Sequence, residues 1–115
     1  MCGIAGFIDF NKRTTVAVLQ QMTDAMHHRG PDDAGYEVYE SPQALTGFGQ
    51  RRLSIIDLSP LGHQPMHAGN LIVNFNGEIY NFKEIRKELE EKGYSFISWS
   101  DTEVILKGYQ CWGIE

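Results

Sequence analysis

The chain begins with MCGIAGFID, residues 1–9, in which a cysteine and a glycine lead into a short apolar run. The run lies between Gly3 and Asp9 and has the length of a buried strand bounded by a glycine and a charged turn. We therefore predict a strand at Gly3–Asp9, in the centre of a sheet.

Helical periodicity follows this strand and returns near the end of the chain. Apolar residues recur at three- and four-residue spacing between Thr15 and His27, with Thr14 or Thr15 as the cap. Two later helices are predicted from capping-box patterns, one from Asn81 and Glu84 through Lys92 with Gly93 as its stop, the other opened by Ser100 and Glu103.

Short strands fill the middle of the chain. They are predicted at residues 36–39, 45–49, 53–56 and 71–75, with a loop at 59–69 rich in proline and glycine. Because strands and helices do not alternate regularly, the pattern indicates an α+β fold. The strands are too few to cover the last two helices, so the sequence reads as an incomplete domain.

Composition excludes several classes of partner. The net charge is −5, and no Lys/Arg cluster is larger than a pair such as Arg51-Arg52, so neither nucleic acid nor an anionic membrane is expected to bind. No apolar run reaches the roughly 18 residues of a membrane-spanning helix. Two cysteines are too few for a disulfide framework, so we expect a reducing, cytoplasmic environment.

Cys2 has distinctive chemistry if the initiator methionine is removed. The residue then carries a thiol and a free α-amine, and an α-amine is partly unprotonated near neutral pH. The amine can take the thiol proton, directly or through water, so one residue supplies both nucleophile and base. Retention of Met1 would disable this mechanism.

Each candidate residue also has an ordinary structural interpretation. A free cysteine usually packs as a small hydrophobic residue. Asn76-Gly77 alone would favour a two-residue hairpin turn, and Asp101 behind Ser100 suits a helix N-terminus. The other motifs decide between these interpretations.

Ordered motifs make the chain resemble a known family from residue 1 to about residue 107. They are MCGIAGF, HHRGPDDAG, RRLSIIDLSPLGHQPM, and FNGEIYNF followed by SDTEVIL. Their order resembles the glutaminase half of glutamine-hydrolysing asparagine synthetase, a class II glutamine amidotransferase. This resemblance implies a four-layer αββα sandwich of the N-terminal-nucleophile hydrolase type, and hydrolysis of the L-glutamine side-chain amide to glutamate and ammonia.

The resemblance also implies the roles of the catalytic residues. Cys2 matches the nucleophile that forms a thioester. The side-chain NH₂ of Asn76 and the backbone N–H of Gly77 match the oxyanion hole.

The remaining site residues would hold the two charged ends of glutamine. Arg52 matches the arginine that binds the α-carboxylate, since its planar fork suits two oxygens. Backbone groups of Leu53 and Ile55 are expected beside it. Asp101 matches the residue that receives the α-ammonium, with Glu78 assisting.

Other motifs receive structural interpretations. Arg29 and Asp32 are expected to form an ion pair within their loop. His63 and His67 lack a helical i, i+4 arrangement, so no metal is predicted. Cys111 is expected to be a core residue on the apolar side of the last helix.

Residues 1–115 are therefore interpreted as the N-terminal part of a truncated amidotransferase domain, without its C-terminal synthetase domain. No SGGxDS-like phosphate loop occurs, so no cofactor is expected in this chain, and ATP and Mg are expected only for the absent domain. Exposed strand edges would make the isolated chain associate with itself.

Two alternatives to ammonia supply for asparagine synthesis remain open. The chain is a catalytically unarmed structural or interaction module, or it is the glutaminase domain of another amidotransferase with a different acceptor.

Overall fold

The computed structural model describes residues 2–54 and 59–114. Five strands and three α-helices occur in these ranges, with short 3₁₀ turns at His27–Arg29 and Pro60–Gly62. The strands are β1 (Gly3–Asp9), β2 (Asp33–Glu40), β3 (Leu45–Arg52), β4 (Met66–Ala68) and β5 (Leu71–Val73). The helices are α1 (Val16–Asp24), α2 (Phe82–Glu91) and α3 (Asp101–Trp112). The α+β prediction is confirmed.

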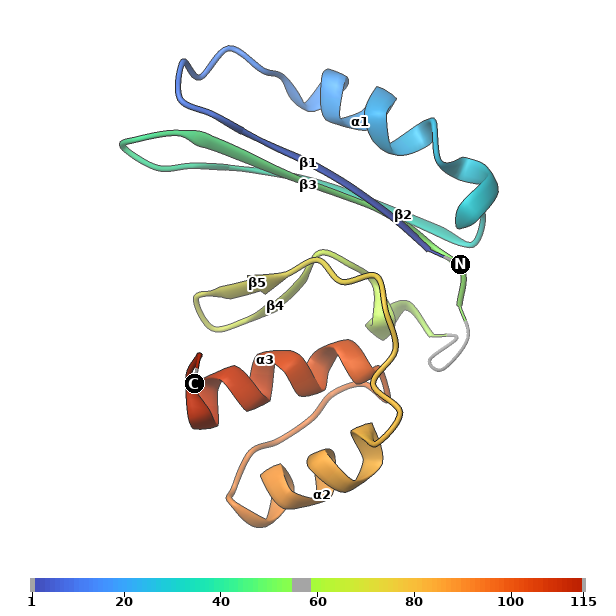
Figure 1. The fold of residues 1–115 in the computed structure, drawn as a ribbon, viewed down its shortest axis with the longest axis vertical. Helices are drawn as coiled ribbons and strands as arrows, with labels where there is room; N and C mark the ends of the chain where they lie inside the picture. The colour runs from blue at the N-terminus through green and yellow to red at the C-terminus, as the bar shows by residue number, and fades with distance from the viewer. Residues whose placement is uncertain (1, 55–58, 115) are drawn as a thin grey trace.

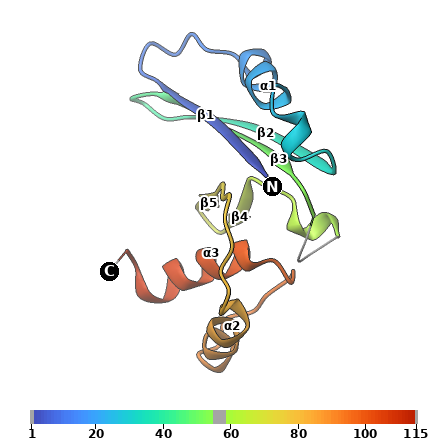
Figure 2. The same ribbon diagram turned by 45° about the vertical axis from the view of Figure 1, so that its right-hand side comes forward.

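The strands form two antiparallel sheets that lie one above the other (Figure 1). The order in the first sheet is β1-β3-β2, and the second sheet is the hairpin β4-β5. Helix α1 covers the face of the first sheet that points away from the hairpin, and α3 packs on the hairpin from the other side (Figures 1 and 2). Helix α2 packs on α3 at the outside.

The prediction that Gly3–Asp9 is a central, buried strand is wrong in two respects. Its bounds are those of β1, but β3 occupies the centre of the three-stranded sheet. Ile4 and Ile8 remain 45% and 65% exposed. They alternate with positions that face α1, such as Gly3, which packs against Met26, and so they lie on the opposite face.

Of the apolar residues whose spacing predicts this helix, α1 fully buries only Leu19. Thr15 caps it as expected, since its hydroxyl oxygen accepts from the Val18 N–H at 3.4 Å. Leu19 and Thr23 are fully buried, whereas Val18 and Met22 are exposed. The Thr23 hydroxyl donates to the Leu19 carbonyl at 2.7 Å, which satisfies its polar atom inside the core.

The two later helices begin near the predicted residues, but neither forms a capping box. Asn81 makes no side-chain cap bond to α2. Ser100 Oγ accepts from the Thr102 N–H at 3.1 Å and caps α3. The Glu103 carboxylate instead binds the backbone N–H and hydroxyl of Ser98, at 2.8 and 2.6 Å.

The segment between β3 and β5 differs most from the prediction. Leu53 and Ser54 are not in a strand, and the rest of the predicted strand at 53–56 lies outside the described residues. Strand β4 falls within the predicted loop at 59–69. The loop between β4 and β5 contains Gly69, whose φ of +59° suits glycine.

A few buried apolar residues lie between the layers. Leu19 lies between α1 and the first sheet. On the other side, Leu89 of α2, Val104 and Leu106 of α3 and Met66 of β4 are buried, with α3 packed between α2 and the hairpin. Within the described ranges, no helix is long and apolar enough to cross a membrane.

Candidate active site

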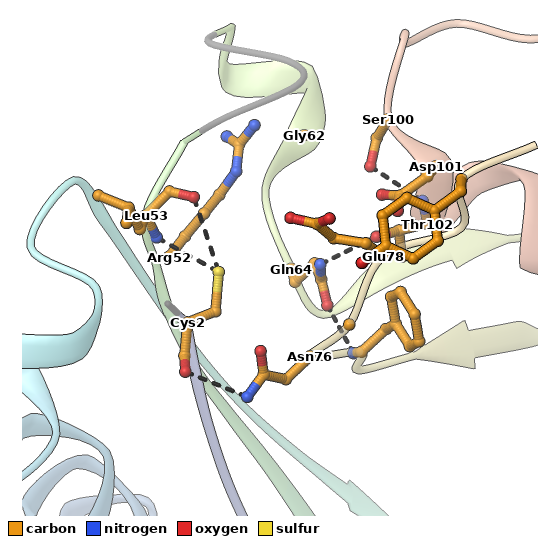
Figure 3. A pocket seen from close by; sticks show the side chains of 13 residues that line it. Cys2, Arg52, Leu53, Gly62, Gln64, Asn76, Glu78, Ser100, Asp101 and Thr102 are labelled. Atoms are coloured by element: carbon orange, nitrogen blue, oxygen red, sulfur yellow. Dashed lines mark hydrogen bonds between the residues drawn. The ribbon is translucent and has the colours of Figure 1, made fainter. Parts of the chain in front are cut away.

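A cavity of about 470 Å³ lies between the end of β3, the segment after β5 and the start of α3 (Figure 3). Seven of the eight candidate residues line it: Cys2, Arg52, Leu53, Asn76, Gly77, Glu78 and Asp101. The eighth, Ile55, lies outside the described residues, as does Met1. The fold therefore gathers residues from four separate segments around one cavity.

Strand register explains why Cys2 and Arg52 meet. Gly3 pairs with Arg51 in the antiparallel ladder of β1 and β3, so Cys2 continues the ladder beside Arg52 and Leu53. The thiol lies against the Leu53 backbone. Its Sγ accepts from the Leu53 N–H at 3.4 Å and donates to the Leu53 carbonyl at 3.7 Å.

Two side chains hold the carbonyl of Cys2. Arg29 Nε and Asn76 Nδ2 each donate to this oxygen at 3.1 Å. Because a side-chain NH₂ has two N–H groups, this bond leaves Asn76 a second donor. The Asn76 amide is thus held at the backbone of Cys2 without using all its donors.

The predicted ion pair between Arg29 and Asp32 is wrong. Arg29 binds the Cys2 carbonyl, and the Asp32 carboxylate accepts from the Ser54 N–H at 2.8 Å. Each of these two charged side chains thus binds the backbone of a residue that is distant in the sequence. The loop supports the ends of β1 and β3 instead of closing on itself.

Alternation along β3 separates the two neighbouring arginines. Arg51 faces α1, where its Nε donates to the Gly30 carbonyl at 2.9 Å and its guanidinium lies 3.5 Å from Asp24. Arg52 faces the cavity with only 8% of its surface exposed, and donates to the Ser59 carbonyl at 3.0 Å. A Cβ on Gly62 would lie 2.2 Å from an Arg52 guanidinium nitrogen, so a side chain there would displace the guanidinium.

The opposite wall comes from the segment after β5 and from the start of α3. Asn76-Gly77 follows β5 but is not the turn of a hairpin, so the hairpin interpretation is wrong. Asp101 is 6% exposed, and one of its oxygens accepts from the Ile79 N–H at 2.9 Å. Glu78 is exposed at the cavity, which therefore carries two carboxylates facing one guanidinium.

Sequence reasoning missed several residues that line the cavity. Gln64, Thr102 and Ser100 are buried polar residues, and Tyr80 is 91% exposed at the cavity. Gln64 lies within the motif RRLSIIDLSPLGHQPM, but the sequence indicates no role for it. One of its partners is a backbone N–H group, and a sequence does not show which backbone groups a side chain binds.

The histidines and the second cysteine lie outside this cavity. His63 pairs with Asp33 at 2.7 Å, and His67 pairs with Glu37 at 2.6 Å. Among residues 2–54 and 59–114, no group of three or more histidine, cysteine or acidic residues is placed to hold a metal. Cys111 is partly exposed on α3, so its predicted place in the core is wrong.

Comparison with known proteins identifies the family. A family profile described as "Glutamine amidotransferase domain" matches residues 1–115. The chain belongs to this family. The amidotransferase domain is 44% identical to asparagine synthetase [glutamine-hydrolyzing] 1 of Bacillus subtilis, over 96% of the chain.

Two further relatives match almost the whole amidotransferase domain. A putative asparagine synthetase [glutamine-hydrolyzing] 2 of Methanocaldococcus jannaschii is 37% identical over 100% of the chain. A protein of Gibberella zeae named amidase chry2 is 34% identical over 99% of it. The chain spans 25% of the length of the archaeal relative and 18% of the length of each of the other two.

Proposed function

We propose that this domain hydrolyses the side-chain amide of L-glutamine to glutamate and ammonia. One observation carries the proposal: a single cavity is lined by a thiol, an amide donor, a buried guanidinium and a buried carboxylate. A cavity of a few hundred Å³ with few polar groups is typical of small-molecule sites.

The charged ends of glutamine fit opposite walls. Arg52 binds the α-carboxylate, with backbone groups of Leu53 and Ile55 beside it. Asp101 and Glu78 receive the α-ammonium. This polarity directs the side-chain amide toward Cys2.

The chemistry begins with transfer of the thiol proton to the α-amine of Cys2, once Met1 has been removed. The thiolate attacks the amide carbon, a C–S bond forms, and the C=O pair moves onto oxygen. Asn76 and the Gly77 N–H stabilise this oxyanion.

Collapse of the intermediate breaks the C–N bond, and the ammonium of Cys2 returns its proton to the leaving nitrogen. Ammonia departs and a thioester remains. Water attacks the thioester through a second oxyanion, which releases glutamate and restores the thiol.

The larger context is also part of the proposal. Residues 1–115 form the N-terminal part of a four-layer αββα domain of the N-terminal-nucleophile type. The order of α1, two stacked sheets and α3 supports this (Figure 1), as does the exposure of Ile4 and Ile8. The ammonia passes to a C-terminal synthetase domain that uses ATP and Mg for asparagine synthesis in the cytoplasm.

Another acceptor is the second candidate, because one relative is named an amidase. Glutamine hydrolysis is common to both candidates. They differ only in which molecule takes the ammonia, so assays of acceptor-dependent products in the full-length protein separate them.

The test is alkylation of the full-length protein by a diazoketone analogue of glutamine, followed by mass spectrometry. Loss of Met1 and one adduct on Cys2 are expected. Cys2→Ala should remain unlabelled, and Cys111→Ala should react like wild type. A processed protein that stays unlabelled, or is labelled on Cys111, refutes the proposal and favours the unarmed module.

A further inference from the structure

Gln64 connects the two sides of the far wall of the cavity. Its side-chain oxygen accepts from the Phe75 N–H at 2.7 Å, and its side-chain nitrogen donates to the Thr102 hydroxyl at 3.1 Å. The residue is only 7% exposed. Figure 3 shows both bonds beside the cavity.

The partners of Gln64 are the immediate neighbours of proposed substrate-binding groups. Phe75 directly precedes Asn76-Gly77, the proposed oxyanion donors. Thr102 directly follows Asp101, the proposed ammonium site. The carboxamide of Gln64 therefore sets the distance between the proposed oxyanion donors, where the side-chain amide of glutamine reacts, and the proposed site for its α-ammonium.

The backbone of Gln64 is fixed to the sheet that carries Cys2. A Cβ on Gly35 of β2 would lie 1.8 Å from the Gln64 carbonyl oxygen, so the two backbones are packed directly together. The pairs of His63 with Asp33 and His67 with Glu37 hold the flanking residues on β2. Gln64 thus links the wall of the thiol to both parts of the opposite wall.

A second buried glutamine supports Phe75 from the other side. Gln50 of β3 is 1% exposed and donates to the Phe75 carbonyl at 3.4 Å. Gln50 therefore fixes Phe75 relative to β3, whereas Gln64 connects Phe75 to α3.

We propose that Gln64 is a positioning residue for glutamine hydrolysis. It acts through the segment at Phe75 and through the start of α3, and touches no reacting atom itself. This inference rests on the proposed function. Loss of its two bonds misplaces the oxyanion donors and the ammonium site independently.

The experiment measures kcat and KM for glutamine in the full-length protein. Gln64→Met keeps the approximate shape and removes both bonds, and we expect kcat/KM to fall about 10²-fold, from a lower kcat and a higher KM. Thr102→Val removes only the bond toward α3, so KM should rise with kcat within about threefold of wild type.

Two further variants complete the design. In Gln64→Met/Thr102→Val, the second change should add little to KM, since the bond is already broken. Gln110→Met changes an exposed glutamine of α3 outside the cavity and should match wild type. The fraction of protein molecules alkylated on Cys2 gives the concentration of active sites. Expressing kcat per active site corrects it for any unfolded protein.

The outcomes are separable. If Gln64→Met has the kcat and KM of wild type, the inference is overturned. A fall only in the number of active sites, with kcat per site and KM unchanged, also overturns it and leaves Gln64 a structural role. Absence of glutamine hydrolysis in wild type refutes the proposed function itself, before any variant is compared.

Discussion

Replacement of Gly35 by alanine tests how tightly the cavity depends on contact between its layers. The new Cβ would lie 1.8 Å from the Gln64 carbonyl oxygen, 2.9 Å from its carbonyl carbon and 3.1 Å from His63 Nε2. An ordinary Cβ contact begins at 3.4 Å, so the backbones must separate by about 1.5 Å. The obstacle is backbone, which cannot rotate away as a flexible side chain can.

The separation has two measurable effects. Bonds of 2.7 and 3.1 Å from Gln64 to Phe75 and Thr102 cannot survive a shift of that size without rearrangement. We therefore expect kcat/KM for glutamine to fall about 10²-fold. Overpacking should also cost about 1–3 kcal/mol of the free energy of unfolding, measured by urea denaturation followed by circular dichroism.

Gly108→Ala is the matched control. Its Cβ would meet only Trp112, at 3.4 and 3.5 Å, within the same helix. Alanine there should keep activity and raise stability by up to about 1 kcal/mol through helix propensity. A Gly35→Ala protein with the stability and kcat/KM of wild type would refute the reasoning.

Three other changes have expected outcomes. Asn76→Ala should lower kcat for glutamine about 10²- to 10³-fold in steady-state assays, since one oxyanion donor is lost, and an unchanged kcat would contradict this role. Leu89→Ala should cost about 2–5 kcal/mol in denaturation experiments because Leu89 is fully buried, whereas exposed Glu91→Ala should cost little. Hydrogen bonds from the Thr14 hydroxyl and from the backbone of Thr14 and Arg13 lower the pKa of Asp9. Its contribution is therefore complete above about pH 4 and lost as pH falls below that, so the stability difference between wild type and Asp9→Asn should shrink on acidification, and a difference that grows would contradict it.

Local signals in the sequence predicted the bounds of the strands and helices better than they predicted which elements lie side by side. The bounds of β1 followed from an apolar run between a glycine and an aspartate. Its place at the side of β3 depends on pairing between residues 36 to 48 positions apart, which no local pattern encodes. The same limit explains why Ile4 and Ile8 were expected to be buried.

Capping patterns predicted where helices begin but not all their hydrogen bonds. Ser100 has the extended backbone of an N-cap, with φ −69° and ψ 137°, and its hydroxyl bonds to α3. Asn81 has φ −98° and ψ 27°, and makes no side-chain cap bond. The Glu103 carboxylate accepts from three donors, the backbone N–H of Ile97 and the backbone N–H and hydroxyl of Ser98. A capping box would have used the backbone N–H of Ser100.

Apart from the chemistry of an N-terminal cysteine, the candidate site was visible only through the family resemblance. Asp101 alone suits a helix N-terminus, and its place beside the same cavity as Cys2 depends on the whole fold. The family is confirmed, while the individual roles stay predictions. Gln64 could not be found from the sequence because its oxygen binds a backbone N–H, a group that almost every residue has.

The residues that line the cavity are far apart along the chain, and this separation has a consequence during synthesis of the protein. Cys2 and Asp101 are 99 positions apart, and Thr102 follows. At translation rates of about 5–20 residues per second, the thiol leaves the ribosome about 5–20 s before the last wall of its cavity. The nascent N-terminus is open to methionine removal throughout that interval, and the proposed nucleophile joins the proposed substrate site only after Asp101 has emerged.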